Sequence, residues 1–271
     1  MKKTIPLIQV DAFTDRPFCG NPAAVCITSQ PLPDSLMQHI ASEMNLAETA
    51  FLVKEKKGFH LRWFTPTTEV ELCGHATLAS AHVLWEKGLL PPDKNAVFQT
   101  LSGELVASLQ GEAIVLDFPA KPARKVEQKE IKVLFPNLDI QFLGKSDFDY
   151  LVVLENEAAL LKLEPDFNRM ATFDARGFIV TARSASSAYD YISRFFAPAC
   201  GVNEDPVTGS AHCTLAPYWS EVIGKQKLTG YQASARGGYV GTEYLGERVK
   251  LKGKAITVMR AEMLVPESGQ E

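Results

Sequence analysis

The chain has 271 residues, of which 46% are hydrophobic, and carries a formal net charge of −4. This length suits one large domain or two of medium size, with enough apolar residues for a packed core. The weakly acidic balance, without a run of five like charges, argues against nucleic acid and against a polybasic membrane surface. No apolar run approaches the ~18 residues of a membrane span.

The first half is predicted to be rich in strands, with two helices. Asp34–Met44 carries an apolar stripe that predicts a helix, and the small-residue segment Ala76–Trp85 predicts a second one. Alternating or β-branched runs bounded by turn residues predict the strands Ile5–Phe13, Ala23–Ile27, Thr49–Lys54, His60–Phe64, Val97–Thr100, Leu105–Leu109 and Ala113–Phe118.

The second half is predicted to follow the same style. The segment Ala211–Val222 predicts a helix, although Pro217 inside it should produce a kink. The predicted strands are Tyr150–Leu154, Phe178–Ala182, Tyr189–Phe196, Gln232–Ser234, Tyr239–Tyr244, Val249–Lys252 and Ala255–Glu262. Hairpin-rich halves with one long buried helix each favour an α+β fold over a doubly wound parallel sheet.

The polar stretch Pro119–Gln128, which contains two prolines, is the best candidate for a linker. We therefore expect an N-terminal lobe over residues 1–118 and a C-terminal lobe over residues 119–271. The final strand could instead belong to the N-terminal lobe.

The two halves carry similar motifs in the same order. Arg62-Trp-Phe-Thr-Pro and Arg194-Phe-Phe-Ala-Pro each precede a polar loop, a glycine and a small-residue helix. The two glycines, Gly74 and Gly209, are 135 residues apart, which is about half of the chain. This predicts an internal repeat, and two equal halves usually place a site in the crevice between them.

Each of these glycines lies where a loop enters a helix. A helix N-terminus presents unpaired N–H groups and a partial positive charge, so two such termini in matched positions would suit a carboxylate. Gly74, Gly209 and Ser210 are therefore candidates for substrate binding. The structural alternative is that each glycine only forms a turn and that Ser210 is an N-cap.

Three residues near these loops are candidates for proton transfer. His75 can exchange a proton near neutral pH, but a packed or capping histidine is at least as good an interpretation. Asp205 precedes the second helix, where an Asp-Pro turn is the simpler explanation. Glu48 opens an apolar run and could act as a base there, or could merely cap together with Asn45. The residues alone leave all three alternatives open.

Cys73 stands at the mouth of the first loop, and Thr208 occupies the matching position of the second. A racemase of the paired-thiol kind needs a cysteine on each side of the substrate carbon, so this difference argues against that mechanism. Both residues remain candidates for substrate contact.

Cofactor and metal motifs are lacking in the sequence. No strand is followed by a GxGxxG or Walker-type loop, and HExxH, CxxC and calcium-loop patterns are absent. The five cysteines fit reduced thiols, and the N-terminal apolar stretch, broken by Pro6, does not fit a signal peptide. We expect a cytoplasmic protein without cofactor or metal.

Four motifs resemble the phenazine-biosynthesis PhzF-like isomerase family, which is related to diaminopimelate epimerase in fold. They are DAFTDRPFCGNPAAV, NLAETAFL, RWFTPTTEVELCGHATLASA and FAPACGVNEDPVTGSAHCTLA, and together they run through nearly the whole chain. The resemblance implies two pseudo-symmetric lobes, each a barrel-like sheet around a central helix, and a cleft between them.

The resemblance also implies roles for individual residues. Carried onto this sequence, the acid/base of the family falls on Glu48, and its assisting polar pair falls on His75 and Asp205. Gly74, Gly209 and Ser210 fall on the cleft loops at the starts of the two helices. The implied reaction is a cofactor-independent proton shift on a small, carboxylate-bearing, possibly cyclic dihydro-aromatic substrate, as in phenazine biosynthesis, by a homodimer.

Two other functions remain open at this point. An epimerase or racemase could use Cys73 and one further base, and a non-catalytic protein of the same fold could bind a small anionic molecule. The sequence does not distinguish the substrate among small carboxylates.

Overall fold

The computed structural model describes residues 3–127, 129–136 and 138–265, and it separates into two compact units. The first unit runs to Asp117 and takes up the chain again from Gly253 onward, and the second runs from Phe118 to Lys252. Among the described residues, no helix is both long enough and apolar enough to cross a membrane.

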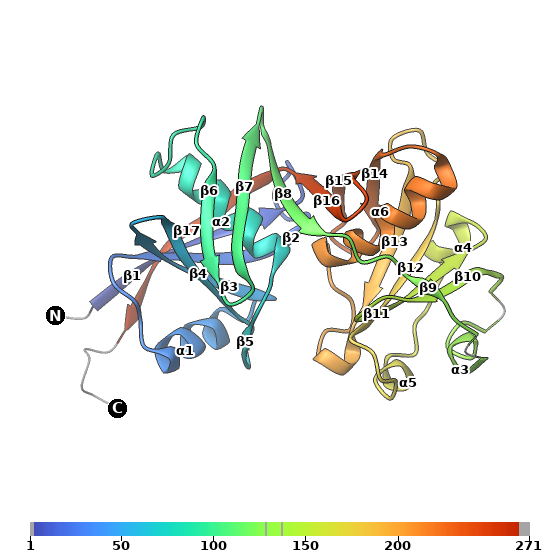
Figure 1. The fold of residues 1–271 in the computed structure, drawn as a ribbon. Coiled ribbons are helices and arrows are strands. Elements are labelled where there is room, and N and C mark those ends of the chain that lie inside the picture. Colours follow the sequence, from blue (N-terminus) through green and yellow to red (C-terminus); the bar gives the residue numbers. More distant parts are fainter. Residues whose placement is uncertain (1–2, 128, 137, 266–271) are drawn as a thin grey trace. The chain divides into compact units, whose positions relative to one another are not determined.

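Over its described residues, the first unit is a mixed sheet with two helices. Strand β17 pairs with β1, and the order continues through β2, β3, β4, β6 and β7 to β8 (Figure 1). The β2–β3 and β4–β6 pairs are parallel and the other neighbours are antiparallel. The elements are β1 (Lys3–Ala12), β2 (Asn21–Thr28), α1 (Asp34–Met44), β3 (Glu48–Glu55), β4 (Gly58–Phe64), β5 (Glu69–Val70), α2 (Gly74–Glu86), β6 (Ala96–Thr100), β7 (Gly103–Gln110), β8 (Ala113–Pro119) and β17 (Ala255–Val265).

The second unit repeats this plan. Its strands pair in the order β9, β10, β11, β12, β13, β14, β15 and β16, and the β11–β12 and β13–β14 pairs are the parallel ones. The elements are β9 (Arg124–Lys125), α3 (Lys129–Lys132), β10 (Ile140–Lys145), β11 (Asp149–Leu154), α4 (Glu157–Leu161), α5 (Phe167–Met170), β12 (Gly177–Arg183), β13 (Tyr191–Phe196), the 3₁₀ turn η1 (Pro198–Cys200), α6 (Gly209–Ile223), β14 (Lys227–Gln232), β15 (Gly238–Tyr244) and β16 (Arg248–Gly253).

Each unit contains an equivalent set of side-chain interactions, in addition to the same strand order. In the first unit, Arg62 forms a bidentate ion pair with Glu69 at 2.6 Å and covers the ring of Phe64 at 5.1 Å. In the second, Arg194 pairs with Glu204 at 2.8 and 2.9 Å and covers Phe196 at 4.8 Å. Both arginines belong to the repeated motif, so strand order and contacts together confirm the predicted repeat.

The long helix of each unit is buried. Helix α2 packs against β1, β2, β3, β7 and β17, and α6 packs against β14 and β15. Small residues such as Ala76, Ala79 and Ala81 let α2 lie close to the strands, and a helix that is apolar all round belongs in a core.

Pro217 lies inside α6, yet the helix continues to Ile223. Proline has no N–H, so it leaves the carbonyl of Cys213 without its helical donor. The backbone N–H of Lys121 donates to that carbonyl at 2.9 Å. The segment after β8 thus satisfies the group that the proline leaves open.

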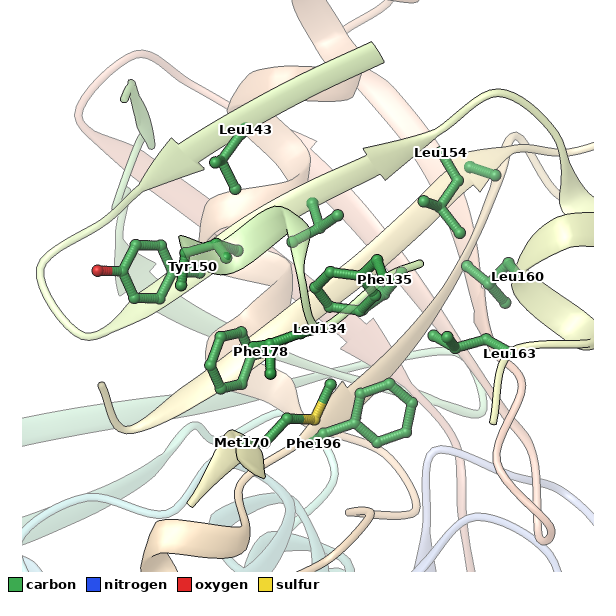
Figure 2. Close-up of a cluster of buried hydrophobic side chains, with 14 of the residues drawn as sticks. Leu134, Phe135, Leu143, Tyr150, Leu154, Leu160, Leu163, Met170, Phe178 and Phe196 are labelled. Atoms are coloured by element: carbon green, nitrogen blue, oxygen red, sulfur yellow. The ribbon is translucent and has the colours of Figure 1, made fainter. Parts of the chain in front are cut away.

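Alternate residues of β11 serve two different cores. Leu151 and Val153 pack with Trp219 on the face covered by α6. Val152 and Leu154 face the short helices α3, α4 and α5 instead, in a cluster shown in Figure 2. Because successive side chains of a strand point to opposite faces, a strand covered on both sides is apolar throughout.

The structure differs from the sequence prediction in several elements. Strand β14 runs over Lys227–Gln232, so the predicted strand Gln232–Ser234 was wrong apart from its first residue. The predicted linker contains the short strand β9, which pairs with β10. The short helices α3, α4 and α5 and the strand β10 were not predicted.

Candidate active site

The first unit brings Glu48 and His75 together at one edge of its sheet. The parallel strands β2 and β3 both begin there, with Ala23 opposite Glu48 in the register. Helix α2 begins beside them and carries His75 in its first turn. Strands that run in parallel start at the same sheet edge, so a loop, a strand start and a helix start meet at this point.

The imidazole of His75 lies between three other side chains. Its Nε2 is 3.1 Å from Oε2 of Glu48, an ion-pair contact that is not aligned as a hydrogen bond. Its Nδ1 lies 3.2 Å from Nδ2 of Asn21 and 3.5 Å from Sγ of Cys73. The ring therefore connects a carboxylate on one side to a thiol and an amide on the other.

Burial makes these contacts strong. The side chain of His75 is 6% exposed and that of Glu48 is 19% exposed. Oε2 of Glu48 is itself buried, so the accessible part of this side chain lies on its other atoms. One carboxylate oxygen is thus buried beside the imidazole, and part of the Glu48 side chain remains accessible to solvent.

The electrostatics of the group favour a charged His75. Burial lowers the pKa of the imidazole, but contact with the Cys73 sulfur and with the Glu48 carboxylate raises it well above its ordinary value. Burial, followed by the charge of Glu48, raises the pKa of the Cys73 thiol to about 11.

Glu48, Cys73 and His75 also offer potential metal ligands within 4.8 Å of one another. A carboxylate, a thiolate and an imidazole are ligand types that zinc accepts. Here, however, Glu48 contacts Nε2 and Cys73 contacts Nδ1, on opposite sides of the ring. One ion binds a single ring nitrogen, so the arrangement fits a chain of proton-exchanging groups better than one ligand set.

Asn21 is a member of this group that the sequence did not single out. It opens β2, and its side chain contacts His75, which lies 54 positions away. The preceding Gly20 has a φ of +66°, and a Cβ there would meet the carbonyl oxygen of Ala12 at 2.1 Å. The Gly-Asn-Pro turn was a signal for a special backbone, but nothing local pointed to His75.

The second unit holds the predicted residues Asp205, Thr208, Gly209 and Ser210. The hydroxyl of Thr208 donates to Oδ2 of Asp205, and the amide of Gln232 bonds to both residues. Gly209 and Ser210 form the start of α6, where Gly209 is buried and Ser210 is half-buried. Asp205 and Thr208 are therefore joined within one loop.

Both long helices begin without a side-chain cap. Neither Cys73 at the start of α2 nor Thr208 at the start of α6 accepts a hydrogen bond from the first turn of its helix. Uncapped N–H groups of a first turn can receive an anionic group of a ligand. Gly74, half-buried like Ser210, lies in the first turn of α2.

His212 is buried within α6. Its Nδ1 lies 2.8 Å from the hydroxyl of Tyr191. Burial, slightly opposed by Gln232, lowers its pKa to about 3, so the ring is neutral at physiological pH. This environment is that of a packing residue rather than of a proton donor.

Comparison with known proteins identifies the family. Residues 10–261 match the family described as phenazine biosynthesis-like protein. The chain belongs to this phenazine biosynthesis-like family. An uncharacterized isomerase of Halalkalibacterium halodurans is 51% identical over 269 residues, covering 97% of this chain and 99% of the relative.

Solved structures of other proteins are also similar to this chain. A PhzF-family phenazine biosynthesis protein of Enterococcus faecalis superposes with a TM-score of 0.92 at 39% identity, covering 97% of this chain and 100% of the other. A predicted epimerase of Pseudomonas aeruginosa has a TM-score of 0.72 at 19% identity, with 97% and 100% covered, which shows a shared fold. The expected α+β, epimerase-like fold class is thus confirmed.

Proposed function

We propose that this protein is an isomerase that moves a proton between carbons of a small carboxylate-bearing substrate without a cofactor. The observation that carries the proposal is the contact between Glu48 and His75 at 3.1 Å in a largely buried setting. Membership of the family supports the reaction class, as does the printed description of the Halalkalibacterium halodurans relative as an isomerase.

In this proposal Glu48 removes a proton from a substrate carbon and returns it to a conjugated position. Its buried oxygen stays against the His75 imidazolium, so the proton is taken up on the accessible side of the carboxyl group. The positive ring stabilises the carboxylate between turnovers and limits the side chain to one orientation.

The loops at the helix starts are assigned to binding. The N–H groups around Gly74, and likewise those around Gly209, are each proposed to bind an anionic group of the substrate, and Ser210 would add a hydroxyl. Asp205 is assigned the second polar role, in which it holds a hydroxyl or amine of the substrate. The resemblance of the motifs around these residues to the family supports this assignment.

The environment of Cys73 weighs against the epimerase alternative. A thiol whose pKa is raised to about 11 is almost entirely protonated at pH 7, whereas proton abstraction by sulfur needs the thiolate. The matching position, Thr208, offers no second thiol.

A time course of proton NMR spectra in heavy water tests the proposal. Wild type and Glu48→Gln would each receive trans-2,3-dihydro-3-hydroxyanthranilate, followed by a panel of small unsaturated carboxylates. We expect conversion with deuterium entering at carbon, reduced by about 10²- to 10⁴-fold in the variant.

Glu55→Gln is the matched control, because Glu55 ends the same strand and is exposed. Its rate should equal that of wild type. A wild-type rate in Glu48→Gln on a true substrate would refute the assignment of the base, and no deuterium uptake from any member of the panel would refute the isomerase.

A further inference from the structure

The side chain of Gln232 holds the loop that carries Asp205 in the second unit. Gln232 is the last residue of β14 and is fully buried. Its Oε1 accepts the backbone N–H of Thr208 at 2.9 Å. Its Nε2 donates to the carbonyl of Asp205 at 2.8 Å and to the hydroxyl of Thr208 at 3.1 Å.

These partners leave only one orientation for the amide. Rotating it by 180° would place the NH₂ group against the N–H of Thr208 and the oxygen against the carbonyl of Asp205. Both contacts would be repulsive, so the amide oxygen and nitrogen are assigned unambiguously by their neighbours.

The fixed amide in turn fixes the direction of the Thr208 hydroxyl. A hydroxyl has one hydrogen, and Oγ1 of Thr208 already accepts from Gln232. Its hydrogen is therefore available for Oδ2 of Asp205, which it contacts. The chain of donors runs from Gln232 through Thr208 to Asp205, and it makes that oxygen of Asp205 an acceptor.

Thr208 is the N-cap residue of α6, but its side chain does not cap the helix. A threonine at a helix N-cap normally accepts an N–H from the first turn, which stabilises the helix by about 1 kcal/mol. No such bond is formed at the start of α6. The hydroxyl is used on the aspartate instead of on the helix.

The loop does not depend on Gln232 alone for its path. The N–H of Asp205 donates to the carbonyl of Phe195 at 3.0 Å, and the hydroxyl of Ser234 donates to the carbonyl of Pro206 at 2.8 Å. What Gln232 adds to these anchors is the polarity of the Thr208–Asp205 contact.

We propose that Gln232 is a positioning residue that acts through the Thr208 hydroxyl to hold the Asp205 carboxylate in one orientation, with Oδ2 as an acceptor, during turnover. This inference rests on the proposed function, in which Asp205 contacts the substrate. It extends the site to a buried residue that neither the motifs nor the family resemblance indicated.

The test is the rate of deuterium incorporation into whichever substrate the NMR experiment identifies, compared between wild type and a set of variants. Gln232→Met removes the amide and keeps the length, and Thr208→Val removes the hydroxyl and keeps the shape. We expect both to lower kcat by about 10- to 100-fold with a much smaller change in KM, as is typical of partners that orient a functional group. Thr208→Ser keeps the hydroxyl and should restore most of the rate.

Ser234→Ala is the matched control, since it removes an anchor of the same loop without touching the Thr208–Asp205 contact. We expect it to retain the wild-type kcat. In an Asp205→Asn background, Gln232→Met should cost little more, because residues that act through one group are not additive. A purely structural role would lower the rate in both backgrounds equally.

Each outcome decides between the two proposals. If thermal unfolding shows that Gln232→Met does not fold, Thr208→Val carries the test. Wild-type kcat in Thr208→Val, or equal losses in Ser234→Ala, would overturn the positioning role while leaving Glu48 in place. A wild type that exchanges no deuterium would instead overturn the isomerase itself, and the positioning role with it.

Discussion

At the scale of single residues, His75 couples stability to pH. Its pKa is raised in the folded protein, so the folded state binds a proton more tightly than the unfolded chain does. The resulting stabilisation is complete below the unfolded pKa of about 6.5 and is lost as the pH rises through the folded value. Measured by urea unfolding, the difference in unfolding free energy between wild type and His75→Gln should shrink as the pH rises from 6 to 9.

His82 is the matched control for this experiment. Burial lowers its pKa, so the folded state binds a proton less tightly than the unfolded chain does, and the resulting destabilisation disappears as the pH rises to the unfolded value. The difference between wild type and His82→Gln should therefore increase with pH from 5 to 7. Parallel slopes for the two variants would contradict the assigned charge on His75.

Cys73 provides a second prediction at this scale. Because its thiol is buried and its pKa is raised to about 11, iodoacetamide at pH 7.5 should modify it slowly. Cys73→Ser should retain most of the turnover. Mass spectrometry in a Cys19→Ser, Cys200→Ser background, which removes the more accessible thiols, measures the modification. Rapid alkylation with loss of activity would favour the epimerase alternative.

The sequence offered Glu48, Cys73, Gly74 and His75 as candidates because they lie in short motifs. It did not offer Asn21 or Gln232, whose partners are 54 and 24 positions away. Such contacts depend on which strands start at the same sheet edge. Local spacing carries no information about that arrangement.

At the scale of elements, Gly230 explains why β14 was placed wrongly. A glycine inside a strand usually suggests an interruption. Here it makes room for the ring of Tyr191, which an added Cβ would meet at 2.5 Å. The strand therefore continues through Gly230 and ends at Gln232.

This packing predicts the effect of a single methyl group. Gly230→Ala should lower the unfolding free energy by about 1–3 kcal/mol, because the extra carbon overpacks a fully buried ring. Gly241→Ala, on the neighbouring strand β15, is the control, because the added Cβ would come no closer than 3.3 Å to another atom, the Cβ of Lys252. Urea denaturation compares the two, and an equal loss in both variants would show that Tyr191 is not the cause.

The short helices show the opposite limit of sequence prediction. Asn156 caps α4 and Asp166 caps α5, each accepting an N–H three residues later. These helices have only five and four residues, too few for an apolar stripe to repeat. The long helices α1, α2 and α6 were predicted because their patterns extend over three or more turns.

At the scale of the whole molecule, the repeat explains why comparing two short motifs was enough to predict the plan of both units. In each unit the antiparallel and parallel pairs follow one another in the same order, and the long helix follows the Arg-x-Phe-x-Pro motif. A chain built twice on one plan shows related motifs half its length apart. The plan could be predicted from sequence, whereas the side chains that join each loop to its sheet could not.

The chain does not divide into halves at one point, because its last strand belongs to the first unit. Strand β17 pairs with β1 from Lys3 opposite Val265 to Ala12 opposite Ala255. It arrives there after the whole second unit has been completed. Removing it would deprive β1 of one of its two neighbouring strands and leave a row of backbone groups without partners.

Truncation after Lys252 should therefore act on one unit. We expect amides of β1 and β2 to lose protection in hydrogen exchange, whereas those of β11 and β12, which pair within the second unit, keep it. Truncation after Val265 is the control and should leave both sets protected. Since Glu48 pairs into the sheet through β2, the shorter chain should also lose turnover. Loss of protection in β11 and β12 as well would show that the two units fold as one cooperative body.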